Sequence, residues 1–124
     1  MKKKAIIISI KSTTLSKKEK ILLSKKEPWG LILFNRNIKS IDQIKNLIKN
    51  IKKLTNNKKF PILIDEEGSN VSRLKNIINH SFKANYFGDL YKLDKKIALS
   101  LYKNYLKSLC NNLRYIGINI NTIP

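Results

Sequence analysis

The chain of 124 residues has few of the residues that build metal, redox and phosphate sites. Its one cysteine, Cys110, excludes an internal disulfide and a zinc cluster built on cysteines. Its one histidine, His80, has no acidic neighbours in sequence, which favours a solvated loop residue over a ligand. Its four glycines are isolated, which excludes a glycine-rich phosphate loop. We therefore expect neither a metal nor another cofactor.

Long hydrophobic runs are also missing, and no stretch approaches the ~20 apolar residues of a membrane span. Lys2, Lys3 and Lys4 precede the apolar run 5–10, as in a signal peptide. The run is shorter than the ~7–15 residues of a signal-peptide core, and no small-residue cleavage site follows it. We interpret the run as a buried first strand and expect a cytoplasmic protein without a membrane partner.

Acidic residues are scarce: the chain has eight of them and 26 lysines and arginines, which gives a net charge of +18. This excess is typical of a nucleic-acid or anionic-membrane surface. It is also explained by codon drift, because lysine, asparagine and isoleucine are all encoded by A/T-rich codons. Nucleic-acid sites favour arginine and interleaved aromatics, whereas only three of the cations are arginines. We favour drift and do not expect a nucleic-acid partner, and we keep a basic nucleic-acid-binding module as an alternative function.

Apolar runs and helical periodicity predict the order β-α-β-α-β-loop-α-β. The runs predict short strands buried on both faces, as in a parallel sheet covered by helices. They lie at 5–11, 31–34 and 60–64, and a fourth begins at 118. An irregular stretch is expected from Glu66 to about Leu93. Trp29 is expected to pack at the entrance of the second strand. Tyr86 and Phe87 are expected to cover one end of the fold or a neighbouring helix, and contact with a substrate is the alternative.

Three helices are predicted from their start and stop signals. Two capping boxes are predicted, one at Ser16 with Glu19 and one at Ser40 with Gln43. In a capping box, a serine and a side chain three residues later accept from backbone N–H groups at the start of the helix. The first helix runs to Lys26 and is ended by Pro28 and Gly30. The second carries an apolar stripe formed by Ile44, Leu47, Ile48, Ile51 and Leu54, and Asn56 and Asn57 end it.

The last helix begins at the cap Asp94 and stops at Gly117. Its predicted apolar side is formed by Ile97, Leu101, Tyr105, Leu109 and Ile116, with Ala98, Tyr102, Leu106 and Leu113 beside them. Cys110, next to Leu109, is expected to be a small residue on the core side of this helix.

The candidate site follows the third strand, since parallel α/β folds bind ligands at the carboxyl ends of their strands. Asp65, Glu66 and Glu67 stand there in a row, and Gly68 allows a sharp turn. Arg73 is close enough to return to Asp65 across the loop. An acid beside a guanidinium suits a sugar, because one accepts from hydroxyls and the other donates to them. A salt bridge that only fixes the loop explains the pattern equally well.

The acidic cluster is not expected to hold a complete glycosidase pair. Such pairs flank the scissile bond. Asp65 and Glu67 can share a face of the chain, but both then approach from the same side.

With these residues in view, the sequence resembles the N-terminal barrel domain of glycoside hydrolase family 3, in particular the bacterial β-N-acetylhexosaminidases. Residues 29–37 (WGLILFNRN) are similar to the family's G-G-x-I-L-F-x-R-N segment. Residues 61–68 (PILIDEEG) and 71–74 (VSRL) are similar to its D-Q-E-G-G and V-x-R-[LF] blocks. Residues 117–124 (GININTIP) are similar to G-x-[DN]-x-[DN]-x-x-P. The resemblance covers nearly the whole chain in order.

The resemblance implies a partial (β/α)₈ TIM barrel, with residues 1–124 supplying about the first four strands and their helices. It implies a retaining β-N-acetylhexosaminidase that cleaves terminal β-linked N-acetylglucosamine from muropeptides or glycosides in peptidoglycan recycling. Asp65 and Arg73 would bind sugar hydroxyls, and Arg36 would organise the barrel rim.

The resemblance also implies that the catalytic aspartate and histidine belong to later strands, beyond Pro124, so that the chain is inactive alone. Ser69 and Asn70 depart from the family's glycine and arginine in the loop. A split-enzyme subunit, completed by a second polypeptide that supplies the C-terminal half, is a further alternative.

Overall fold

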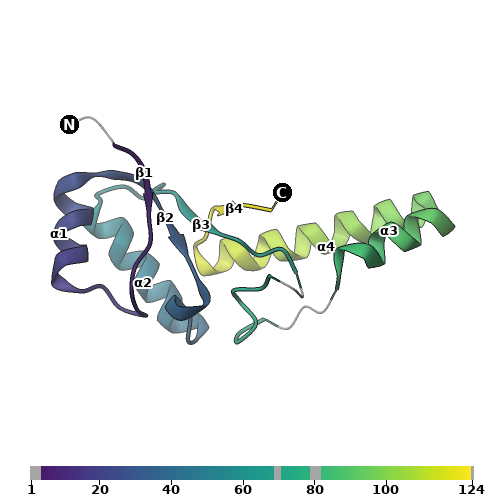
Figure 1. Ribbon diagram of the computed structural model, residues 1–124, viewed down its shortest axis with the longest axis horizontal. Coiled ribbons are helices and arrows are strands. Elements are labelled where there is room, and N and C mark those ends of the chain that lie inside the picture. The colour runs from purple at the N-terminus through teal and green to yellow at the C-terminus, as the bar shows by residue number, and fades with distance from the viewer. Residues whose placement is uncertain (1–3, 69–70, 79–81, 124) are drawn as a thin grey trace.

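The computed structural model describes residues 4–68, 71–78 and 82–123, and in them the strands form one parallel sheet (Figure 1). The sheet order is β1-β2-β3-β4, and all three neighbouring pairs run parallel. The strands are β1 (Lys4–Ile8), β2 (Pro28–Leu33), β3 (Ile62–Ile64) and β4 (Ile120–Asn121). Each strand adds to the edge left by the one before it, as consecutive strands of a (β/α)₈ barrel do. The predicted α/β class with a parallel sheet is confirmed.

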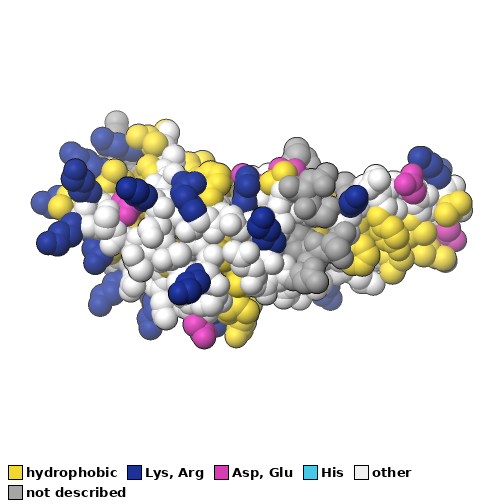
Figure 2. Space-filling view, turned by 60° about the horizontal axis from the view of Figure 1, so that its bottom comes forward, with side chains coloured by type: hydrophobic (Ala, Val, Ile, Leu, Met, Phe, Trp, Pro, Cys, Tyr) yellow, Lys and Arg dark blue, Asp and Glu magenta, His cyan; other side chains and the backbone are white. Residues whose placement is uncertain are grey.

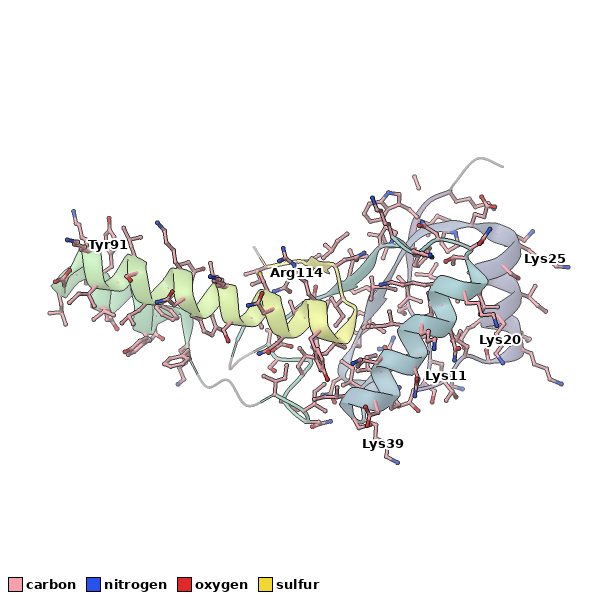
Figure 3. All side chains as sticks on the ribbon, turned by 180° about the vertical axis from the view of Figure 1, so that it is seen from behind. Lys11, Lys20, Lys25, Lys39, Tyr91 and Arg114 are labelled. Atoms are coloured by element: carbon pink, nitrogen blue, oxygen red, sulfur yellow. The ribbon has the colours of Figure 1, made fainter. Side chains whose placement is uncertain are left out.

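The helices connect the strands and form two groups. The first group is α1 (Lys17–Lys26), the short 3₁₀ helix η1 (Asn35–Asn37) and α2 (Ile41–Leu54). The second is α3 (Ala84–Leu93) with α4 (Lys95–Ile116), both between β3 and β4. Figures 1 and 3, seen from opposite sides, place α1 and α2 on one side of the sheet. In both views α3 and α4 form a hairpin that extends away from the sheet.

The hydrophobic core lies between the sheet and the helices. The stripe predicted on α2 is confirmed, with Ile44, Leu47, Ile48 and Ile51 all buried. It packs in one cluster with Leu23 of α1, Leu31 and Leu33 of β2, Ile62 and Ile64 of β3, and Leu109, Leu113 and Ile116 of α4. Of the side predicted for α4, Ile97 and Leu101 are exposed, because the N-terminal half of the helix lies beyond the sheet.

The start of α1 confirms the predicted capping box. Ser16 Oγ accepts from the backbone N–H of Glu19 (3.3 Å), and the Glu19 carboxylate accepts from the backbone N–H groups of Ser16 (2.7 Å) and Lys11 (2.9 Å). Burial raises the pKa of Glu19, but these hydrogen bonds and the Lys11 charge lower it more, and the pKa ends below its usual value. Glu19 therefore links α1 to the segment that leaves β1.

The start of α2 differs from the predicted box. Ser40 Oγ caps the N–H of Gln43 (3.2 Å), but Gln43 Oε1 accepts from the backbone N–H of Lys39 (2.9 Å) instead of from that of Ser40. Gln43 Nε2 donates to the carbonyl oxygens of Thr13 (2.7 Å) and Asn37 (3.2 Å). The amide thus fixes the β1–α1 loop, a role that a carboxylate could not fill because it has no donor.

The strands begin and end at other residues than predicted. β1 ends at Ile8, and most of its residues are exposed, because it is an edge strand with one neighbour. β2 begins at Pro28 and contains Gly30. Both residues were predicted to end α1. Glu27, in a left-handed conformation, ends α1 in their place. β3 covers only the last three residues of the predicted run.

Three further expectations are wrong, and a fourth is confirmed for one of its two residues. The stretch predicted to be irregular contains α3. Trp29, near the start of β2, is 43% exposed, and Cys110 is exposed on α4. Phe87 covers the neighbouring helix α4 as expected, because its ring centroid lies 5.0 Å from that of Tyr102 and 5.3 Å from that of Tyr105. Tyr86 is exposed, and its ring contacts Phe82 and Phe87.

None of the helices in the described part of the chain has the length and apolar character needed to cross a membrane. Figure 2 shows lysine and arginine side chains spread over the body around the sheet, and hydrophobic side chains gathered on the helical hairpin.

Candidate functional site

Asp65 and Arg73 meet beyond the carboxyl end of β3, as the sequence predicts. Arg73 Nη2 lies 3.5 Å from Asp65 Oδ2, and the two side chains are 30% and 24% exposed. A half-buried ion pair keeps more of its electrostatic strength than a pair in open solvent, since it is less screened. Each side chain still reaches solvent, so the pair can meet a ligand.

A residue from the segment after β4 holds the other carboxylate oxygen. The hydroxyl of Thr122 makes a short hydrogen bond to Asp65 Oδ1 and also contacts the carbonyl oxygen of Ile64 (3.1 Å). The backbone N–H of Thr122 donates to the same carbonyl (2.9 Å). Asp65 is therefore fixed from both sides, by Arg73 within its own loop and by Thr122 from the segment after β4.

The segment after β2 supports Arg73. The guanidinium lies 5.5 Å from the centroid of the Phe34 ring, and Asn35 Nδ2 donates to the carbonyl oxygen of Arg73 (3.2 Å). Arg73 Nε is buried and has no hydrogen-bond partner among the described residues. The side chain thus keeps donor capacity that the described part of the protein does not use.

Glu66 fixes the loop. It is fully buried, and its Oε2 accepts from the backbone N–H groups of Arg73 (2.8 Å) and Leu74 (2.9 Å). Burial raises the pKa of the Tyr105 hydroxyl, and the negative charge of Glu66 raises it further. Glu66 thus fixes the loop together with the Asp65–Arg73 salt bridge, whereas Glu67 is exposed.

Gly68 supplies the predicted turn in this loop. Its φ of +126° lies in the region that favours glycine, and a Cβ there would stand 3.0 Å from the carbonyl oxygen of Phe82. The backbone N–H of Glu67 donates to the carbonyl oxygen of Val71 across the turn (2.9 Å). Ser69 and Asn70, where the sequence departs from the family pattern, and His80 lie outside the described residues.

Two asparagines of the last segment join it to β3. Asn119 Oδ1 accepts from the N–H of Ile62 (2.7 Å) and its Nδ2 donates to the carbonyl oxygen of Phe60 (3.0 Å). Asn121 makes the same kind of pair with the N–H and carbonyl oxygen of Glu66 (2.9 and 3.1 Å). These amides extend the sheet pairing past both ends of the short β3–β4 ladder.

Arg36 lies at the same edge of the sheet but takes no part in the ion pair. Its Nε donates to the carbonyl oxygen of Ile10 (3.1 Å) and its Nη2 to Ser9 Oγ (3.1 Å), while the guanidinium covers the Phe34 ring at 4.6 Å. It joins the ends of β1 and β2, which agrees with the predicted role at the rim.

Four residues that were not predicted as parts of the site contribute to it: Phe34, Asn35, Asn121 and Thr122. The first two directly follow β2 and the last two end or follow β4, and position at a strand end is the signal that could have found them. Among the described residues, no group of three histidines, cysteines or acids is arranged to hold a metal.

These features define a parallel α/β sheet with an acid–guanidinium pair at the carboxyl ends of its strands, the arrangement predicted for the first strands of a sugar-binding barrel. Comparison with known proteins confirms the resemblance to the family 3 β-N-acetylhexosaminidases, although no family model matches the chain. The chain is 29% identical over 119 residues to a β-hexosaminidase of Hydrogenovibrio crunogenus, and 25% identical over 119 residues to one of Thioalkalivibrio sulfidiphilus.

Solved structures give the same result. NagZ of Neisseria gonorrhoeae, in complex with N-trifluoroacetyl-D-glucosamine, superposes with a TM-score of 0.86 at 28% identity over 98% of this chain. A family 3 β-N-acetylglucosaminidase of Paenibacillus, at 23% identity and a TM-score of 0.76, shares the fold. The matches cover 96% of this chain but only 33% and 34% of the two β-hexosaminidases, so the chain spans about a third of their length.

Proposed function

We propose that residues 1–124 are the N-terminal portion of a family 3 barrel domain in a retaining β-N-acetylhexosaminidase, in which Asp65 and Arg73 bind the terminal N-acetylglucosamine. The observation that carries the proposal is the Asp65–Arg73 ion pair at the carboxyl edge of the sheet. It combines an acceptor and a donor for neighbouring hydroxyls with restricted access to solvent.

The pair suits two adjacent sugar hydroxyls. An ionised carboxylate has about four lone-pair sites, and the described contacts of Asp65, from Arg73 and Thr122, occupy two. The free sites accept from sugar hydroxyls, while the solvent-exposed part of the Arg73 side chain donates to the same oxygens. Because Asp65 is held on both sides, it loses little conformational freedom when the sugar binds.

Asp65 and Arg73 position the sugar and do not cleave the bond. By resemblance, the aspartate that attacks the anomeric carbon and the histidine that moves the proton belong to later barrel strands. Retention then follows from two displacements through a covalent glycosyl-enzyme. We propose peptidoglycan recycling in the cytoplasm, with muropeptides as substrates, on the resemblance to the cytoplasmic branch of the family.

The proposed barrel needs a C-terminal part that supplies the remaining strands. Within the described residues β1 pairs only with β2, and β4 pairs only with β3, so both outer edges of the sheet are free to pair. Ile6 and Ile7 of β1 are exposed, as expected of a strand that a further segment covers.

The test is reconstitution. We expect the chain alone not to hydrolyse an aryl N-acetyl-β-glucosaminide. Co-expressed with the part of the Hydrogenovibrio relative that follows the matched region, it should give a complex that does. Asp65→Asn should lower kcat/KM of the complex about 10- to 150-fold, the equivalent of about 1.5–3 kcal/mol for a charged hydrogen bond.

The matched control is Asp89→Asn, which removes an acid from an exposed ion pair with Lys92 (3.0 Å) and should leave kcat/KM unchanged. An active complex that is insensitive to Asp65→Asn would contradict the proposed sugar-binding role. Hydrolysis by the chain alone would contradict the expectation that catalysis needs later strands.

A further inference from the structure

A basic groove lies between α2 and the C-terminal end of α4, on the helix layer shown in Figure 3. Its volume is about 1020 Å³. One wall and the floor come from α2 and the turn after it, and the other wall from Tyr115, Ile116 and Gly117. The groove lies at the amino end of the strands, because α4 ends there and Asn119 binds beside Phe60, before β3. It is therefore separate from the Asp65–Arg73 pair.

Lysine is concentrated in this groove beyond its share in the chain. Five of the twelve lining residues are lysines, against 23 of 124 in the whole sequence. The five are Lys45, Lys49, Lys52, Lys53 and Lys58. No aspartate or glutamate is among the described residues that line the groove. Codon drift explains how many lysines the chain has, but it does not explain their concentration in this lining.

Two contacts direct lysines across the groove. Lys52 Nζ donates to the carbonyl oxygen of Gly117 (3.0 Å), and burial lowers the pKa of Lys52. Lys45 Nζ lies 3.9 Å from the centroid of the Tyr115 ring. The positive groups are thus held between the two helices, where a negative ligand relieves their mutual repulsion.

We propose that this groove binds the phosphodiester backbone of a single-stranded nucleic acid. The lysines of α2 follow one another from Lys45 to Lys53, along about 12 Å of helix, which suits consecutive phosphates more than one isolated anion. Tyr115 is 65% exposed beside them and offers a ring on which a base can stack. A membrane surface fits less well, because Ile48 and Ile116, the isoleucines of the lining, are buried and cannot insert.

The test compares two variants of equal charge by fluorescence anisotropy with a labelled oligouridine. The groove variant carries Lys45→Gln, Lys49→Gln, Lys53→Gln and Lys58→Gln. The control carries Lys17→Gln, Lys25→Gln, Lys103→Gln and Lys107→Gln, all exposed and outside the groove. Glutamine and lysine have similar helix propensities, so both variants should fold, which circular dichroism checks.

We expect the groove variant to bind the oligouridine at least about tenfold more weakly. In a plot of log K against the logarithm of the salt concentration, its slope should become shallower by about 0.7 for each phosphate contact that is lost. The control should lose less than about threefold. Equal losses in both variants would overturn the proposal, because net charge alone would then explain binding. No binding by the unmodified chain would overturn it as well.

Tyr115→Ala tests the choice of ligand. It should weaken oligouridine binding about 5- to 150-fold, the equivalent of the ~1–3 kcal/mol of a stacked base, and leave binding of inorganic polyphosphate unchanged. Equal binding of oligouridine by Tyr115→Ala and the unmodified chain would overturn the single-strand assignment. Equal affinity of the unmodified chain for a duplex, or for phosphatidylserine vesicles, would overturn it too.

Discussion

The side-chain amide of Asn121 binds the peptide backbone of Glu66 with both of its polar atoms, Oδ1 to the N–H at 2.9 Å and Nδ2 to the carbonyl oxygen at 3.1 Å. This pair connects the end of β4 to the loop that carries Asp65 and Arg73. Glu66 in turn binds the backbone of Arg73, so Asn121 stabilises the candidate site through one intermediate residue.

Asn121→Ala should therefore lower the free energy of unfolding by about 1–2 kcal/mol, because it removes two hydrogen bonds at a half-buried position. Urea denaturation measures the change. Asn112→Ala, at an exposed position on α4, is the control and should change stability by less than about 0.5 kcal/mol. Similar values for the two variants would contradict the role of Asn121.

Two glycines give a matched pair of opposite predictions. Gly117 ends α4 with φ +104°, and a Cβ there would lie 3.1 Å from Ile48 Cγ2. Gly117→Ala should therefore destabilise the chain by about 1–2 kcal/mol. Gly88 lies within α3 with no atom within 4 Å of an added Cβ, so Gly88→Ala should stabilise the chain by about 0.5–1 kcal/mol. Thermal unfolding distinguishes the two, and a gain of stability from Gly117→Ala would contradict the account of the α4 end.

Acid stability tests the capping box of α1. The pKa of Glu19 is lower in the folded chain than its usual value of 4.5, so the ionised form is stabilised by folding. This contribution is fully present above about 4.5 and is lost as the pH falls through the lowered pKa. Glu19→Gln should thus be less stable than the unmodified chain at pH 7, and the two should converge in acid. Denaturation curves that stay parallel from neutral to acid pH would contradict this.

Structural features that depend on a local sequence signal were predicted correctly. The caps Ser16 and Asp94, the stop at Gly117 and the stripe of α2 all act within one element, and each is confirmed. Helix α3 was missed because its first residue is preceded by Lys83, which makes no capping hydrogen bond, and because it contains Gly88, a poor helix former. The prediction that β1 is buried was wrong, because an apolar run does not reveal how many strands lie beside it.

The same distinction applies to the candidate site. Asp65 and Arg73 are eight residues apart, so their contact could be predicted within one loop. Thr122 is 57 residues from Asp65, and Asn35 is 38 residues from Arg73. Those contacts depend on the sheet order, which brings the ends of β2, β3 and β4 together. The basic groove depends in the same way on where α4 ends beside α2.

Titration of the ¹⁵N-labelled chain with N-acetylglucosamine tests the central claim most directly. The backbone N–H groups of Asp65, Arg73 and Thr122 should shift and saturate, and Asp65→Asn should abolish these shifts while Asp89→Asn preserves them. Shifts that are absent from these three residues, or that persist unchanged in Asp65→Asn, would contradict the claim that this ion pair binds the sugar.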